Sequence, residues 1–360
     1  MNRAILAVAG GRKTQSIIDN CTACPEDRRI LVLGYTTASQ DELASRIRSA
    51  GIRGHRVEVL GWFSFLLQHF IRPYLPLLYP GHRLTGLNFD GDPGRYAKDA
   101  KRFLDMDDRA YRLHLAQLAH DVMRASRGGV IDRLEHIYDE IYIDEVQDLG
   151  GWDLEVINAL LKAHLKVTMV GDMRQALLST NIRDPKNKKY QGEKIFVWFQ
   201  MMEKKNLLEI TQRPTTYRSN QTIASFSDTI FDPQLGYAPT SSASTETHTH
   251  TGLFTVRKAD ADEYAQRYGA LCLRHNKLSA RGLDLPFLTF GLSKGRTVDH
   301  VLIYPTTPMT KFLTGVADLA GQSACQLYVG VTRAKHSVAF ITDEQIPGFT
   351  EWSPRQGQLP

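Results

Sequence analysis

Short apolar runs rich in isoleucine, valine and leucine recur along this 360-residue chain and alternate with longer amphipathic stretches. Each run has about the length of one strand and lacks a regular polar alternation, which is typical of strands buried on both faces of a parallel sheet. The runs are AILAV, RRILVLGYT, EIYIDE, KVTMVGD, GLFTV, LPFLTF, HVLIYP and VAFITD. Helical patterns such as QDELASRIRSAG and LEVINALLKAH lie between several of them. This alternation predicts an α/β fold built from parallel sheets.

The composition excludes few classes of protein. Hydrophobic residues make up 42% of the chain, which is enough for real cores and argues against a disordered protein. A formal charge of +5 permits a polyanionic partner, but scattered surface lysines would give the same total. No stretch approaches the roughly 18 apolar residues of a membrane span, and four cysteines favour a reducing compartment. We expect a cytoplasmic protein without a membrane partner, in which Cys21 and Cys24 are buried thiols rather than a metal or redox pair.

The first apolar run ends in a glycine turn, followed by Lys13 and Thr14 at the start of a helical pattern. This layout is typical of a phosphate-binding loop, because backbone N–H groups and the helix dipole favour phosphate. Lys13 would add a point charge and Thr14 a magnesium ligand. The loop departs from the pattern G-x-x-x-x-G-K-T at Ala7 and at Arg12, and the second departure matters if that position needs an unusual backbone angle. The residues expected around the phosphates are Ala9, Gly10, Gly11, Arg12, Lys13, Thr14 and Gln15.

A second candidate site lies at the end of the run EIYIDE, where two acids follow each other. Parallel sheets place ligands at the carboxyl ends of their strands. Asp144 could there hold hydrated magnesium, and Glu145 could activate the attacking water. The alternative is an ordinary solvated strand end. The phosphate-loop pattern in the same sheet favours the catalytic interpretation.

Ordered motifs along nearly the whole chain resemble those of the UvrD/Rep-like (superfamily 1A) helicases. The matching segments are residues 144–148 (D-E-x-Q-D), 170–175 (V-G-D-x-x-Q), 216–219 (N-Y-R-S), 293–295 (S-K-G) and 328–335 (Y-V-A-V-T-R-A-K). The resemblance implies that ATP is the substrate and Mg²⁺ its cofactor. It further implies that Gln175 senses the γ-phosphate, Tyr217 stacks on the base, Arg218 touches the γ-phosphate and Arg333 is an arginine finger. The motif that reads adenine is missing, so a preference for ATP over other nucleotides stays open.

The resemblance also implies two RecA-like lobes. The stretch before Gly129 contains helical patterns and no strand-like run, so we expect it to form a helical insertion in the first lobe. Only about a dozen residues separate Asn276 from Thr289, which implies that the second accessory domain of the family is absent. The expected ranges are 1–65 and 130–206 for the first ATP-binding lobe, 66–129 for the insertion, 207–352 for the second lobe and 353–360 for a tail.

Two segments of the first lobe resemble motifs of the family that contact single-stranded DNA. Hydroxyls such as those of threonine bind phosphates, and aromatic rings stack on bases. Core packing is an equal rival for the aromatics. The aromatics that follow the third motif in the family are replaced here by residues 176–179, and the basic loop 183–189 is more often solvated than a phosphate clamp. The residues expected to contact single-stranded DNA are Thr36, Thr37, Trp62, Phe63 and Ser64, with Thr289 and Ser293 in the second lobe.

The leading hypothesis is therefore a compact ATP-dependent helicase or translocase that moves on single-stranded DNA, with RNA not excluded. By resemblance the direction would be 3′ to 5′. The alternative hypothesis is a nucleotide-gated subunit that hydrolyses weakly within a larger DNA-processing or phage-defence complex, which Arg12 motivates. We see no nuclease constellation in the chain, so any cutting would come from a partner nuclease.

Overall fold

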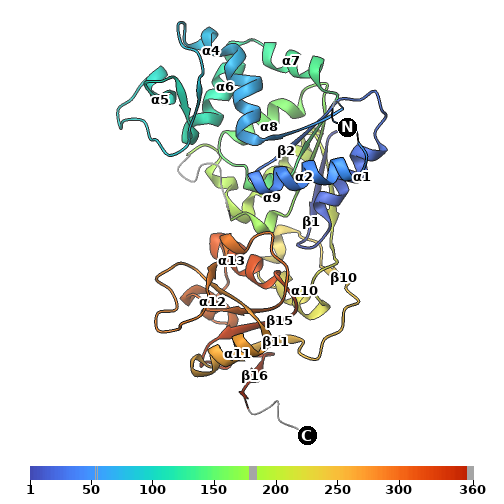
Figure 1. Cartoon of the computed structure of the whole chain (residues 1–360), viewed down its shortest axis with the longest axis vertical. Coiled ribbons are helices and arrows are strands. Elements are labelled where there is room, and N and C mark those ends of the chain that lie inside the picture. Colours follow the sequence, from blue (N-terminus) through green and yellow to red (C-terminus); the bar gives the residue numbers. More distant parts are fainter. Residues whose placement is uncertain (53, 55, 178–184, 355–360) are drawn as a thin grey trace.

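The computed structural model describes residues 1–52, 54, 56–177 and 185–354, which form two lobes, one above the other in Figure 1. The upper lobe contains a sheet of six parallel strands in the order β3-β2-β6-β7-β1-β8. The strands are β1 (Arg3–Ala7), β2 (Ile30–Gly34), β3 (Val57–Gly61), β6 (Glu140–Ile143), β7 (Lys166–Gly171) and β8 (Glu209–Arg213). Every residue of β2 and β6 is buried, as expected for central strands covered on both faces.

Helices cover this sheet on its two faces. Because successive side chains of a strand point to opposite faces, Ile30 and Val32 pack against α1 and α2, whereas Leu31 and Leu33 pack into the core on the other side. Thr36 starts α2 with a capping box, in which its hydroxyl accepts a hydrogen bond from the amide of Ser39. The helices around the sheet are α1 (Lys13–Ala23), α2 (Thr37–Ser49), α8 (Asp153–Leu161) and α9 (Ile195–Lys204).

The insertion is largely helical, as predicted, and forms the top of the upper lobe in Figure 1. Its apolar residues, such as Phe70 and Leu118, belong to the same core cluster as Ile141 and Ile143 of the sheet. The insertion also contains two short parallel strands that its sequence did not suggest. Its elements are a π-helix (Leu66–Ile71), α4 (Arg72–Leu78), β4 (Gly86–Asn88), α5 (Ala100–Phe103), β5 (Arg109–Tyr111) and α6 (Leu115–Ala125). Helices α3 (Trp62–Phe65) and α7 (Gly129–Ile137) of the first lobe flank it.

The lower lobe holds a second parallel sheet in the order β13-β12-β14-β15-β11-β16. Its central strand β15 pairs with β14 and β11 and is buried along almost its whole length. The strands are β11 (Gly252–Val256), β12 (Leu271–Arg274), β13 (Leu288–Thr289), β14 (Val298–Ile303), β15 (Ala334–Ile341) and β16 (Thr350–Trp352). The main helices are α10 (Gln221–Asp228), α11 (Ala261–Tyr268), α12 (Thr307–Leu313) and α13 (Gly321–Val331). The predicted α/β fold of two parallel-sheet lobes is confirmed.

The boundary predicted between residues 206 and 207 lies too early in the chain. Strand β8, which follows it, pairs in parallel with β1 and is therefore the edge strand of the first sheet. The two short parallel strands β9 (Thr215–Thr216) and β10 (Ser241–Ser242) then form the connection to the lower lobe. None of the helices in the described part of the chain has the length and apolar character that crossing a membrane requires.

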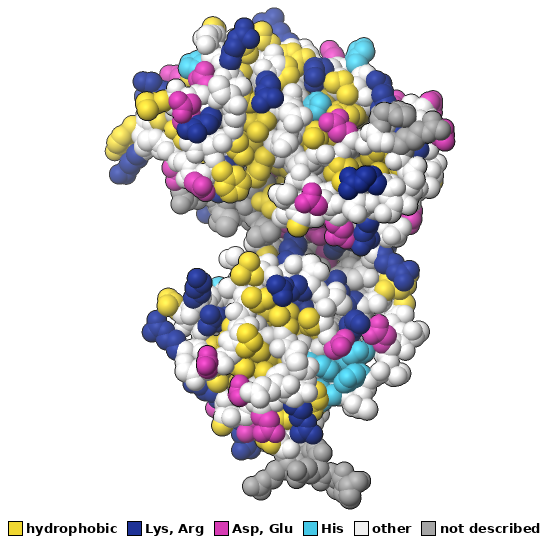
Figure 2. Space-filling model, in the orientation of Figure 1, with side chains coloured by type: hydrophobic (Ala, Val, Ile, Leu, Met, Phe, Trp, Pro, Cys, Tyr) yellow, Lys and Arg dark blue, Asp and Glu magenta, His cyan; other side chains and the backbone are white. Residues whose placement is uncertain are grey.

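Four histidines form one cluster in the lower lobe, where Figure 2 shows histidine side chains gathered beside acidic ones. The ring of His250 lies between the rings of Phe254 and Tyr268, with centroid distances of 4.1 and 3.8 Å. The ring of His248 stacks on His336, and His300 lies edge-on to His248. Burial, together with the neighbouring histidines, lowers the pKa of His250 and of His300 to about 4.

This cluster predicts an acid-sensitive lower lobe. The pKa values of His250 and His300 are lower in the folded protein than in the unfolded chain. The contribution of the two neutral rings to the free energy of unfolding is therefore complete above about pH 6.5 and is lost as the pH falls towards about 4. We expect the melting temperature to fall less between about pH 7.5 and about pH 4.5 in a His250→Asn variant than in the wild type. The exposed His275, replaced in the same way, serves as the control. An equal fall in the His250→Asn variant and the wild type would contradict the prediction.

Candidate nucleotide-binding and nucleic-acid-binding sites

The loop between β1 and α1 lies at the carboxyl edge of the first sheet and approaches the second lobe closely. Gly10 has a positive φ of 74°, and a Cβ atom there would come within 2.6 Å of the Cβ of Arg218. The hydroxyl of Thr216 donates to the carbonyl of Ala9 at 2.8 Å, and the amide of Tyr217 donates to the carbonyl of Gly10 at 3.1 Å. Glycine is therefore required at position 10 by both backbone angle and space.

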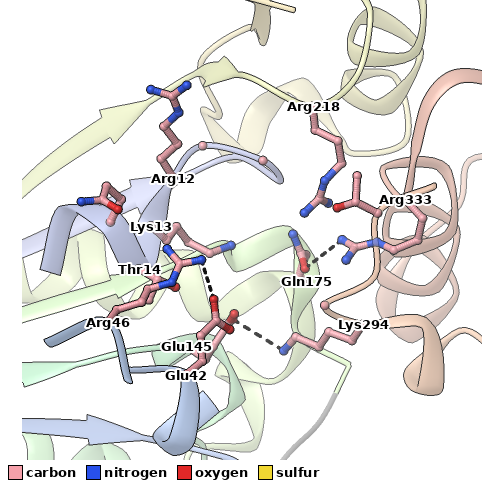
Figure 3. A pocket seen from close by; sticks show the side chains of 15 residues that line it. Arg12, Lys13, Thr14, Glu42, Arg46, Glu145, Gln175, Arg218, Lys294 and Arg333 are labelled. Atoms are coloured by element: carbon pink, nitrogen blue, oxygen red, sulfur yellow. Dashed lines mark hydrogen bonds and ion pairs between the residues drawn. The ribbon is translucent and has the colours of Figure 1, made fainter. Parts of the chain in front are cut away.

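Arg12 takes the left-handed conformation that the sequence left in question, with φ 53° and ψ 41°. This conformation costs a residue other than glycine about 1–2 kcal/mol. The guanidinium of Arg12 stacks on the half-exposed ring of Tyr217, with its Cζ 3.9 Å from the ring centroid. Figure 3 shows the Arg12 side chain directed away from Lys13. Arg12 therefore covers one face of the Tyr217 ring, the residue that the resemblance assigns to base stacking.

A cavity of about 600 Å³ opens between the phosphate loop and the second lobe. Its size is in the range of small-molecule sites, and charged side chains dominate its walls (Figure 3). The lining residues are Gly10, Gly11, Arg12, Lys13, Thr14, Gln15, Glu42, Arg46, Glu145, Gln175, Arg218, Lys294, Gly295, Thr297 and Arg333. An excess of lysine and arginine over glutamate suits a polyanion such as a triphosphate.

Of the two acids predicted after β6, Glu145 lines this cavity. Asp144 is buried and accepts a hydrogen bond from the amide of Glu145 at 2.9 Å. Burial and the charge of Glu145 raise the pKa of Asp144. Burial opposes ionisation of Glu145 as well, but the ammonium groups of Lys294 and Lys13 outweigh it and lower the pKa of Glu145. The two adjacent carboxylates thus have opposite pKa shifts.

These residues fit a magnesium ion bound together with phosphates. Among the described residues no three acidic, histidine or cysteine side chains converge into a complete metal site. Magnesium in phosphate-transfer sites usually takes only one or two protein ligands, with phosphate oxygens and waters as the others. Asp144 at the strand end and Thr14 in the first turn of α1 are suitable ligands of this kind.

Both predicted arginines of the second lobe line the same cavity (Figure 3). Arg333 is buried, and its guanidinium donates to the side-chain oxygen of Gln175 at 3.3 Å. Arg218 donates to the carbonyl of Thr332 at 2.9 Å, which keeps its guanidinium close to Arg333. Burial and the charge of Arg218 lower the pKa of Arg333. Two arginines whose charges interact at one cavity wall favour an anionic ligand.

The predicted strand-contacting residues divide into two groups. Thr36 and Thr37 are exposed, and Phe63, Ser64 and Thr289 are half-buried. All of them therefore remain candidates for binding nucleic acid.

Two predicted strand contacts are corrected. Trp62 is buried, and its indole N–H donates to Asp153 at 2.6 Å, so it packs in the core instead of offering a stacking face. Ser293 is fully buried, and its hydroxyl donates to the carbonyl of Phe290. Residues 178–184 lie outside the described residues. They include part of the segment 176–179 that replaces the family's aromatics and the start of the basic loop 183–189.

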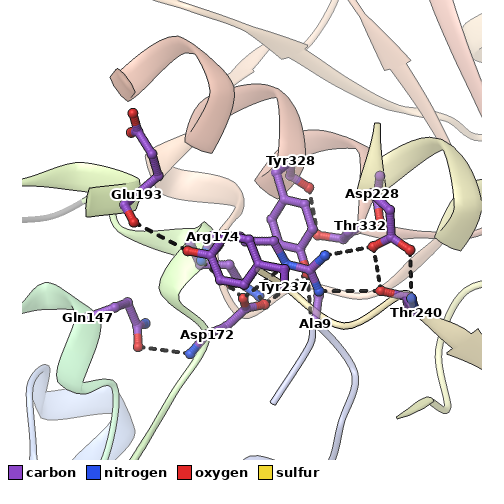
Figure 4. Close-up of polar contacts among 12 residues, drawn as sticks. Ala9, Gln147, Asp172, Arg174, Glu193, Asp228, Tyr237, Thr240, Tyr328 and Thr332 are labelled. Carbon is purple, nitrogen blue, oxygen red and sulfur yellow. Dashed lines mark hydrogen bonds and ion pairs between the residues drawn. The ribbon is translucent and has the colours of Figure 1, made fainter. Parts of the chain in front are cut away.

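A buried set of polar contacts, the interlobe joint, connects the two lobes (Figure 4). The hydroxyl of Tyr328 in α13 donates to Asp172 at 3.0 Å and accepts from the amide of Ala9 at 3.2 Å. The guanidinium of Arg174 lies 4.6 Å from the centre of the Tyr328 ring and donates to Asp228 at 2.7 Å. Asp172 and Arg174 belong to the first lobe, whereas Tyr328 and Asp228 belong to the second. The bond between the amide of Ala9 and Tyr328 ties the phosphate loop directly to α13.

Residues 94–194 match the family model described as the UvrD/REP helicase N-terminal domain. The matched segment contains the two acids after β6 and Gln175. This segment of the chain is similar to the N-terminal domain of UvrD/REP helicases. This finding confirms the resemblance drawn from the motifs, while the Lys-Thr loop lies before the matched residues.

Solved helicase structures resemble the chain over most of its length. The structure of the PRRSV helicase is 14% identical, with a TM-score of 0.45 over 94% of this chain. Arterivirus nonstructural protein 10, also a helicase, is 14% identical with a TM-score of 0.49 over 95% of this chain. Its complex with DNA is 13% identical with a TM-score of 0.48 over 95% of this chain. The chain spans 52%, 59% and 61% of the lengths of these proteins. No curated protein matches the chain.

The site also contains residues for which the sequence predicted no role. Lys294 was recognised only as part of S-K-G, and Asp148 only as the last acid of D-E-x-Q-D. Glu42 and Arg46 form an ion pair of 2.6 Å on α2 and line the cavity. A Glu–Arg pair four residues apart is common on exposed helices, so it carries no signal of its own.

The joint predicts a measurable loss of stability when the hydroxyl of Tyr328 is removed. Tyr328→Phe leaves the buried amide of Ala9 without its acceptor and removes one hydrogen-bond donor from the buried carboxylate of Asp172, which costs about 1–3 kcal/mol. Urea unfolding should show this decrease in the free energy of unfolding. Tyr96→Phe, at an exposed tyrosine of the insertion, should change it by less than about 0.5 kcal/mol. Equal values for the two variants would contradict the role of the joint.

Proposed function

We propose that the chain hydrolyses ATP in this cavity and uses the cycle to move along single-stranded DNA, in the 3′ to 5′ direction. One observation carries the proposal: Lys13 and Glu145 of the first lobe line the same cavity as Arg218 and Arg333 of the second. A ligand that contacts both walls favours their approach, and its hydrolysis removes that preference. Residues Thr36, Thr37, Phe63, Ser64 and Thr289 are the proposed contacts with the strand.

The chemistry follows from charge and position. Phosphoryl transfer depends mainly on orientation and on neutralising the charge of the transferred group. Lys13 and the amides of the phosphate loop would hold the β- and γ-phosphates, and Gln175 would orient the γ-phosphate. Magnesium held by Thr14 and Asp144 would supply further neutralisation when bound. Glu145 would accept the proton of the attacking water, while Arg218 and Arg333 stabilise the charge on the equatorial oxygens and the leaving oxygen.

The first test removes the two groups with the clearest roles. Lys13→Ala and Glu145→Gln should each lower the DNA-stimulated rate of ATP hydrolysis by at least about 100-fold, because each removes a positioned charge or base. Phosphate release in the presence and absence of single-stranded DNA measures this. Arg257→Ala, which breaks only a surface pair with Glu351, should retain full activity. If neither DNA nor RNA stimulates the wild type, the motor function is excluded.

A second candidate function is a nucleotide-gated subunit that hydrolyses weakly, and Arg12 is the observation that favours it. The left-handed backbone of Arg12 is strained, and its guanidinium occupies one face of the Tyr217 ring. Arg12→Gly removes both features. If Arg12 slows hydrolysis in the native loop, this variant should hydrolyse ATP at least about tenfold faster. A decrease of about 1.4 kcal/mol in the activation barrier corresponds to a factor of ten in rate. An unchanged or lower rate would argue against a deliberately weak loop and support the motor.

A further inference from the structure

Lys294 crosses from the second lobe to the carboxylates of the first (Figure 3). It follows the short helical turn Gly291–Ser293, and its Nζ lies 2.5 Å from Oδ2 of Asp148 and 3.7 Å from Oε2 of Glu145. The pair with Asp148 joins residues that are 146 positions apart in the sequence. The lysine therefore touches the proposed catalytic base from the opposite lobe.

The pair with Asp148 is deeply enclosed. The side chain of Asp148 is 2% exposed and that of Lys294 is 13% exposed. The second carboxylate oxygen of Asp148 is buried and has no hydrogen-bond partner. A carboxylate in such surroundings depends strongly on a nearby cation, because solvent does not screen its charge.

Negative charge thus lies beside a cavity suited to a polyanion: Glu145 lines the cavity, and the buried Asp148 pairs with Lys294, which also lines it. Ionised Glu145 and Asp148 repel a triphosphate unless their charge is neutralised. Lys13 and Lys294 supply positive charge there through protein side chains, and a divalent cation would supply it together with the nucleotide. A lysine and a metal that each bring positive charge to the wall of the same cavity can partly substitute for each other.

We propose that Lys294 is a positioning residue that neutralises Glu145 and Asp148 from the second lobe and so lets the cavity take up a nucleoside triphosphate without a divalent cation. The inference rests on the proposed nucleotide-binding function. Uptake of the nucleotide and recruitment of the metal are then separate events. The metal is required for hydrolysis, whereas Lys294 supports the initial binding.

The experiment measures the affinity for a fluorescent, non-hydrolysable ATP analogue in EDTA and in excess Mg²⁺. Lys294→Met keeps the length of the side chain and removes its charge. We expect it to weaken binding at least about tenfold in EDTA but less than about threefold in Mg²⁺, because the metal replaces the missing charge. Lys294→Arg should retain wild-type affinity in both buffers within about threefold, because it keeps the charge. Lys166→Met is the matched control, since Lys166 pairs with Glu140 at 2.9 Å at the opposite end of the same sheet and should change neither affinity.

A double variant separates this electrostatic role from damage to the fold. In Lys294→Met with Asp148→Asn the buried negative charge is removed together with its partner. Its affinity in EDTA should recover most of the loss, so the two substitutions should be clearly non-additive. Additive effects, or an equal fold-change for Lys294→Met in EDTA and in Mg²⁺, would overturn the proposal. If the wild type binds no nucleotide in either buffer, the proposed function fails as well.

Discussion

The hydroxyl of Tyr328 holds the two lobes in register at the point where the chemistry would occur. It bonds the amide of Ala9 in the phosphate loop and the carboxylate of Asp172, and all three groups are buried. Buried polar groups need partners, so this joint fixes the distance between the loop and α13. Arg333 follows two residues after the end of α13. The same helix that anchors the loop therefore places the arginine that faces it.

Much of the fold could be predicted because parallel strands leave a plain trace in the sequence. Strands such as β2 and β15 are buried on both faces and appear as unbroken apolar runs. The phosphate loop and the acids could be predicted to meet because both follow strands of one parallel sheet at its carboxyl edge. Edge strand β8 was missed, since its polar residues are mostly exposed and form no apolar run.

The errors at the site have a different origin. A motif fixes where Trp62 and Ser293 stand in the chain, but not whether their side chains point to solvent or to the core. Both point inwards, because Trp62 finds a buried acceptor in Asp153 and Ser293 one in the carbonyl of Phe290. Lys294 could not be assigned a partner in advance, because its contact with Asp148 depends on how the two lobes dock. Side-chain direction and docking between lobes are properties of the three-dimensional packing that one sequence does not carry.

The insertion shares one continuous core with the first sheet, as the contacts of Phe70 and Leu118 with the cluster around Ile141 show. It is thus an outgrowth of that lobe and not a module on a hinge. A surface of the insertion that contacts nucleic acid is therefore tied to the phosphate loop through the core of the same lobe. For the same reason the insertion is not a removable cassette: deleting it would strip one face of the sheet and expose apolar side chains to water.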